Sequence, residues 1–172
     1  QADQPVFMDL QSALSGEDAR DVSHYLPVGI MGTEVVAWLD HAFVNGRISN
    51  GGLLVHGKLS DVPFTTDPGV FEAVFTGEQF DLAYDSDWPD ITGMNAEVMF
   101  NQGGLKVNVL QGRSDNTKNG VYIPESPGAV TANLVIKQAE VIIPSLNKSK
   151  QLLIKGEAEA GIDQVLAYMQ HT

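Results

Sequence analysis

The sequence predicts an α+β fold in which a mainly antiparallel β-sheet, curved or groove-forming, is flanked by about three short helices. Short segments alternate apolar and polar residues between Gly, Asn and Pro, as in Met94–Phe100. Successive side chains of a strand point to opposite faces, so each such segment has one apolar and one polar face. The predicted helices lie before and after the strands and do not alternate with them, which favours an antiparallel sheet over a parallel, doubly wound one.

Length and composition fit one domain. The 172 residues include 43% hydrophobic and 19% charged residues, which is ordinary for a globular protein that buries a core. We expect a single domain or a fragment of a larger protein, with a helical segment at 15–46, a β-rich segment at 47–143, and a strand plus C-terminal helix at 150–170. Gln1 in place of Met indicates a processed or excised piece.

The charge balance excludes some partners. The formal net charge is -12, from 22 acidic and 10 basic residues. Binding of nucleic acid or of an anionic bilayer surface relies on Lys and Arg, so neither is expected. The absence of cysteine excludes a disulfide framework and a thiolate site. No apolar run approaches the ~20 residues that span a bilayer.

The N-terminal part combines one strand with two helices. Pro5–Leu10 is compatible with an incoming strand. The segment Ser15–Asp18 resembles a helix start with a hydroxyl cap, and that helix should end near Tyr25, before Pro27. A second helix should begin at Thr33 and end at Asn45-Gly46, because Gly accepts a left-handed C-terminal cap. Its apolar stripe consists of Val35, Val36, Leu39, Ala42 and Phe43.

The remaining chain is expected to form strands and one last helix. A turn or bulge is predicted at 50–52, and a hairpin should join Met94–Phe100 to Leu105–Leu110. Pro144 should limit the preceding strand to a sheet edge. The first apolar strand set lies around residues 48–59. Further strands are expected at 71–75, 80–84, 121–123, 130–136, 139–143 and 152–156, and a helix at 161–169.

No motif in the sequence indicates catalysis, so the chain is not expected to be an enzyme or to hold a cofactor. Gly-x-Ser-x-Gly, Gly-x-Gly-x-x-Gly and phosphate-loop patterns are absent. No two of the four histidines are spaced in the sequence as a pair of metal ligands would be. The stretch Asp85–Asp87 resembles the start of a calcium loop, but the glycine and glutamate that complete such a loop are missing, so no metal is expected.

The candidate site is the apolar side of the strands. Two interpretations remain open: this side lines an open groove, or it packs against the Thr33–Phe43 helix as a closed core. The candidate groove-lining residues are Phe71, Phe75, Phe80, Leu82, Tyr84, Met94, Val98, Phe100, Leu105, Val107 and Val109.

Several segments resemble the YhdP-type, AsmA-like proteins of Gram-negative bacteria. The resemblance spans roughly residues 17–170 and combines a helix, a glycine turn, a strand and Trp-Pro. The matching segments are Tyr25–Pro27, Trp38–Arg47, Gly51–Phe64, Gly69–Ala73, Leu82–Ile91 and Leu153–Ala158.

The resemblance implies a large periplasmic protein that is anchored in the inner membrane by an N-terminal helix outside this fragment. Proteins of this type are similar to bridge-like lipid transporters, in which a rolled sheet forms a long apolar groove. The implied partners are phospholipid, moving between inner and outer membranes to support the outer-membrane barrier, and the rest of the full-length chain. The alternative is a non-catalytic structural or protein-interaction module of the cell envelope that docks partners through sheet edges.

Overall fold

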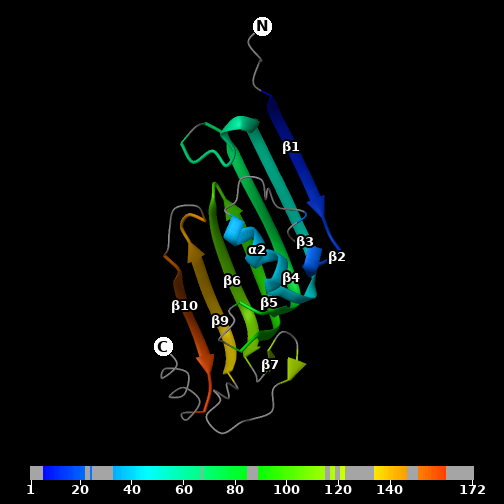
Figure 1. Ribbon diagram of the computed structural model, residues 1–172, viewed down its shortest axis with the longest axis vertical. Coiled ribbons are helices and arrows are strands. Elements are labelled where there is room, and N and C mark those ends of the chain that lie inside the picture. Colours follow the sequence, from blue (N-terminus) through cyan, green and yellow to red (C-terminus); the bar gives the residue numbers. More distant parts are fainter. Residues whose placement is uncertain are drawn as a thin grey trace.

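In the computed structural model, the described residues form one antiparallel sheet of eight strands, seven of which follow one another in a continuous order (Figure 1). The structure describes residues 6–21, 24, 33–66, 68–84, 89–114, 117–118, 121–122, 134–146 and 151–161. These seven strands, in spatial order, are β1 (Phe7–Leu14), β3 (Phe43–Lys58), β4 (Val70–Leu82), β5 (Ile91–Asn101), β6 (Gly104–Ser114), β9 (Leu134–Ile143) and β10 (Leu153–Glu159). The antiparallel sheet predicted from the alternating segments is confirmed.

Smaller elements surround this sheet. Strand β2 (Glu17–Asp18) pairs with β3, and β7 (Thr117–Lys118) pairs with β8 (Val121–Tyr122). The helical elements that span several described residues are α2 (Thr33–Ala42) and the 3-10 helices η1 (Ala19–Asp21) and η3 (Leu59–Asp61). Among the described residues there is therefore one α-helix of several turns, and the prediction of about three helices is corrected there.

The predicted helix over Ser15–Tyr25 is wrong in its described first half. Glu17 and Asp18 pair with Ile48 and Arg47 of β3, and the next described residues, Ala19–Asp21, form the 3-10 helix η1. Backbone pairing with the long neighbouring strand overrides the local capping pattern. The predicted strand near Pro5–Leu10 is confirmed as β1. The predicted C-terminal helix lies outside the described residues after Gly161.

Helix α2 ends earlier than predicted. It stops at Ala42, and the chain enters β3 at Phe43 with no intervening loop. Gly46, predicted as a helix cap, lies inside β3 with a φ of 122°. A Cβ at Gly46 would overlap the Phe80 ring, so the glycine makes room for an aromatic side chain. The prediction was wrong because glycine is favoured both at a helix C-cap and where a neighbouring side chain packs closely against the backbone.

The long strands absorb segments that were predicted separately. The predicted 71–75 strand and residues 80–82 of the predicted 80–84 strand are parts of β4, which bends at register shifts between Gly77 and Leu82, whereas Ala83 and Tyr84 follow its end. The turn or bulge predicted at 50–52 lies slightly earlier: the register of β3 shifts between Ile48 and Asn50, and residues 50–52 pair regularly with β4. Extra residues in one strand bend it and increase its twist.

The β5–β6 hairpin is confirmed as predicted. Gln102 and Gly103, with φ of 45° and 88°, make the turn between paired Asn101 and Gly104. Two consecutive positive φ values give a turn whose twist matches that of the flanking strands.

The C-terminal strands correct one further prediction. Strand β9 pairs with both β6 and β10, so Pro144 does not make it an edge. Pro144 follows the last strand residue, Ile143, where its missing N–H interrupts no ladder. The predicted strand at 152–156 is confirmed as β10, and this strand and β1 form the two edges.

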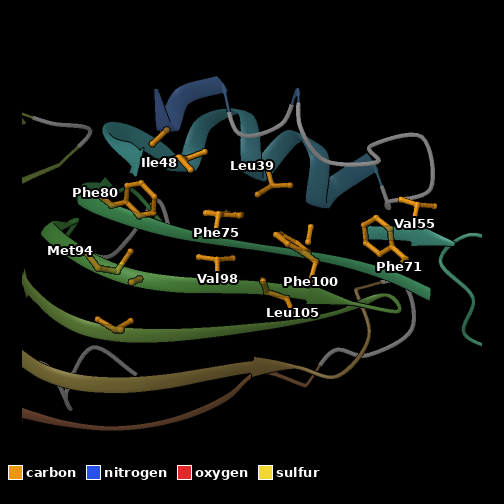
Figure 2. Close-up of a cluster of buried hydrophobic side chains, with 14 of the residues drawn as sticks. Leu39, Ile48, Val55, Phe71, Phe75, Phe80, Met94, Val98, Phe100 and Leu105 are labelled. Carbon is orange, nitrogen blue, oxygen red and sulfur yellow. The ribbon is translucent and has the colours of Figure 1, made fainter. Parts of the chain in front are cut away.

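The core lies on one face of the sheet, beneath α2. Figure 2 shows α2 above β4 and β5 on the concave side, with Leu39 directed towards Phe75 and Phe100. At one end of this face the Phe64 side chain, 2% exposed, closes the core between β3 and β4. Its ring occupies the space in which a Cβ of Gly57 or Gly69 would lie.

Replacing Gly69 with alanine is therefore expected to lower the free energy of unfolding by roughly 1–3 kcal/mol, the usual cost of overpacking. The added methyl group would overlap the buried Phe64 ring. Gly52→Ala is the matched control, because its Cβ would meet only Ser12 O at 3.6 Å. Chemical denaturation of both variants gives the comparison, and equal stabilities would contradict the proposed packing.

Candidate functional site

One row of apolar side chains crosses five neighbouring strands. The pairing register aligns one residue from each strand on the same face of the sheet. This apolar row consists of Phe75, Val98, Val107, Val141 and Ile154. Adjacent strands lie about 4.8 Å apart, so four such spacings give a row roughly 19 Å long.

The next row along the strands is polar in each of the same five strands. This polar row consists of Thr76, Glu97, Asn108, Glu140 and Lys155. Because successive residues alternate between faces, the polar row lies on the side of the sheet opposite to the apolar row. At these two rows the strand pattern gives one polar and one apolar face, but the row next to the polar row on the same side is mainly apolar: Val74, Met99, Lys106, Ile142 and Leu153.

Ion pairs keep the polar row charged. Lys106 Nζ lies 2.5 Å from Glu140 Oε2, and the hydrogen bond from Lys106 is the main cause that lowers the pKa of Glu140. The charge of nearby Lys155 lowers that pKa further. An ionised, paired carboxylate belongs in water, so these contacts favour one orientation of β6, β9 and β10.

Exposure increases along the apolar row with distance from α2. Phe75 and Val98 are 6% and 5% exposed, Val107 and Val141 are half-buried, and Ile154 is 65% exposed. In Figure 2, β9 and β10 are the strands that lie farthest from α2. The same apolar face is thus a closed core at β4 and β5 and is accessible at β9 and β10.

The structure places the predicted groove-lining residues in two groups. Eight are buried in the cluster beneath and beside α2: Phe71, Phe75, Phe80, Met94, Val98, Phe100, Leu105 and Val109. Three are half-buried: Leu82, Tyr84 and Val107. Tyr84 follows β4, and its carbonyl oxygen accepts a hydrogen bond from the indole N–H of Trp38 at 2.9 Å.

Sequence reasoning missed the most exposed part of the apolar face. Val141 and Ile154 extend the row onto β9 and β10, although neither was a candidate. The alternation Ala139–Ile143 carried a usable signal for β9. At the start of β10 the apolar residues Leu152–Ile154 are consecutive. A continuous apolar run does not show which of its residues lie on the apolar face of the sheet.

The described residues offer little for other kinds of chemistry. They contain no group of three His, Asp or Glu side chains placed to hold a metal ion. Asp85–Asp87, the calcium-loop candidate, lies outside the described residues. No helix among the described residues is long and apolar enough to cross a membrane.

An open antiparallel sheet with an apolar row across five strands fits the AsmA-like class of proteins. The profile of the YhdP protein family matches residues 1–172, and the chain belongs to that family. The chain is 26% identical over 161 residues to a protein of Escherichia coli (strain K12) named "Intermembrane phospholipid transporter YhdP". This match covers 92% of the chain and 11% of that relative's length. No solved structure matches the chain.

Proposed function

We propose that this chain is a non-catalytic section of a longer periplasmic protein, anchored in the inner membrane, that carries phospholipid between the inner and outer membranes. The acyl chains lie along the apolar face, and the resulting lipid supply maintains the outer-membrane barrier. The observation that carries the proposal is the apolar row, which crosses five strands and stays accessible at β9 and β10.

The dimensions of the face suit an acyl chain. A bilayer's hydrocarbon core is about 30 Å thick, so one chain extends about half of that. The whole apolar row is roughly 19 Å long, enough for one extended chain, but only the part from Val107 to Ile154, about 10 Å over two strand spacings, is accessible while α2 covers Phe75 and Val98. Acyl chains need a continuous apolar surface and no directional polar contact, and Val107, Val141 and Ile154 provide such a surface.

The relative supports the choice of ligand. Its name describes intermembrane transport of phospholipid, and a sheet with an apolar surface is a physical means of shielding acyl chains from water. The eleven predicted groove-lining residues then divide by role. Val107 contacts lipid directly, and the residues buried beneath α2 support the face or meet lipid only when α2 moves.

Photo-crosslinking in the full-length protein tests the proposal. A diazirine-bearing aliphatic residue at Val107 or Val141 is expected to capture phospholipid in cells. The same group at Asn108 or Glu140, the next residue on the polar face, is the matched control, because all four positions are half-buried.

We expect lipid capture at Val107 and Val141 to be at least tenfold stronger than at the two controls. A tenfold ratio requires a difference in binding free energy of only about 1.4 kcal/mol. Val98 and Glu97 form a second pair that reports on the covered part of the face. Capture confined to Glu97, Asn108 and Glu140 would show that lipid does not use the apolar face.

A specific observation favours a second function, that of a protein-interaction module. Strand β10 is a sheet edge, and Leu153 and Ile154, which point to opposite faces, are 54% and 65% exposed. An exposed apolar edge strand readily pairs with another chain. Native mass spectrometry separates the two functions: bound phospholipid supports transport, and lipid-free protein dimers support the interaction module.

A further inference from the structure

Helix α2 is attached to the sheet mainly near its C-terminal end. Ala42 is followed directly by the first residue of β3, and its carbonyl oxygen accepts a hydrogen bond from Ala83 N–H at 2.8 Å. One turn earlier, the Trp38 indole N–H donates to Tyr84 O at 2.9 Å. Among the described contacts, both of these hydrogen bonds lie in the C-terminal half of α2, and the rest of its described attachment is apolar packing.

That packing involves few side chains. Among the α2 side chains that the structure describes, Leu39 and Ala42 are buried, and Val36 is half-buried. The others are exposed: Thr33, Ala37, Trp38, Asp40 and His41. A segment with few buried apolar contacts opens more readily than the strands of a core.

The sheet beneath α2 does not depend on the helix for its backbone pairing. Strand β4 pairs with β3 on one side and with β5 on the other along most of its length. Movement of α2 would therefore break no bond of these ladders. It would uncover Phe75 and Phe100, which lie next to Leu39 in Figure 2, and Val98, which is paired with Phe75.

We propose that α2 is a displaceable cover over a second acyl-chain site on β4 and β5, and this inference rests on the function proposed above. Lipid on the accessible part of the apolar row lies at Val141 and Val107, and the next position in the row is Val98, beneath α2. An acyl chain makes the same kind of contact there as Leu39, without directional bonds. Lipid and helix thus compete for one surface, and lipid shifts the population towards the displaced state.

Trp38→Phe in the full-length protein tests the competition. This variant keeps an aromatic ring but removes the N–H that donates to Tyr84 O. With the diazirine residue at Val98, lipid capture is expected to rise about fivefold, because a typical net hydrogen-bond contribution corresponds to a population change of this size. Capture at Val141 is expected to stay unchanged.

His41→Gln is the control variant, because His41 is exposed on the same helix and should alter neither capture. Hydrogen exchange provides an independent measurement: α2 amides of the full-length protein should exchange faster when phosphatidylethanolamine vesicles are added. Unchanged α2 exchange would contradict displacement by lipid.

The outcomes of the capture experiment are distinct. If Val141 captures lipid and Val98 capture is the same in the parent protein and in Trp38→Phe, α2 is a fixed cover and the inference fails. Equal capture at Val98 and Val141 in the parent protein would show that α2 covers nothing. Absence of capture at Val141 in every variant overturns the proposed function and this inference together.

Discussion

Replacing Phe80 with alanine is expected to lower the free energy of unfolding by about 3–5 kcal/mol, the usual range for removing a buried aromatic side chain. Phe80 is fully buried and its ring packs edge-on against Phe43 at a centroid distance of 5.3 Å. It lies where β3, β4 and β5 all change register, so it fills space that the bend creates. For a chain of this size, the melting temperature should fall by roughly 10 °C.

Gly77 provides a partner for a double-mutant cycle. A Cβ at Gly77 would overlap the Phe80 ring, so Gly77→Ala alone is expected to cost roughly 1–3 kcal/mol. In the Phe80→Ala background the ring is gone, and the same methyl group should cost little or even fill part of the cavity. Thermal unfolding of the two single variants and the double variant measures this coupling.

Additive losses in that cycle would contradict the contact between Gly77 and the Phe80 ring. A small loss in Phe80→Ala would show that the bend between Gly77 and Leu82 does not need an aromatic side chain. Gly52→Ala again serves as the control, because it introduces a methyl group into β3 with only ordinary van der Waals contact.

The sequence was most informative where one short-range rule determined the structure. The β5–β6 hairpin followed from two alternating segments joined by a turn containing glycine, and its register agrees with that expectation. Gly46 was misread because a helix cap and space for the Phe80 ring require the same small residue. The Glu17–Asp18 segment was misread because its pairing with β3 is non-local, and no local pattern reveals it.

The candidate site was predictable in part for the same reason. Alternation identified the apolar side of β4, β5 and β6, and the register places Phe75, Val98 and Val107 in one row. The closed-core interpretation, in which this side packs against the Thr33–Phe43 helix, holds at β4 and β5, but which strands the helix covers could not be predicted, since the stripe on a helix does not identify its partner surface. The extension to Ile154 depends on pairing between β9 and β10, which the continuous apolar run in β10 obscured.

Placing a carboxylate on the accessible part of the apolar row should have the largest effect on lipid binding. Val141→Asp puts a charge between Val107 and Ile154, where an acyl chain would lie. A charged side chain in hydrocarbon costs about 2.5–3.5 kcal/mol on insertion scales. That cost corresponds to a fall in lipid capture of roughly 100-fold, measured with the diazirine residue at Val107.

Ile142→Asp is the matched control because it changes the next residue on the same strand. Ile142 is also an aliphatic, half-buried residue of β9, but it lies on the opposite face, beside Lys106. A carboxylate there gains a cationic neighbour. Lipid capture at Val107 should therefore stay within about twofold of the parent protein, a change in binding free energy well below the roughly 1.4 kcal/mol that a tenfold change requires. Thermal unfolding of both variants separates loss of binding from loss of fold. Equal losses of capture in two equally stable variants would show that binding does not discriminate between the faces and would contradict the proposed acyl-chain path.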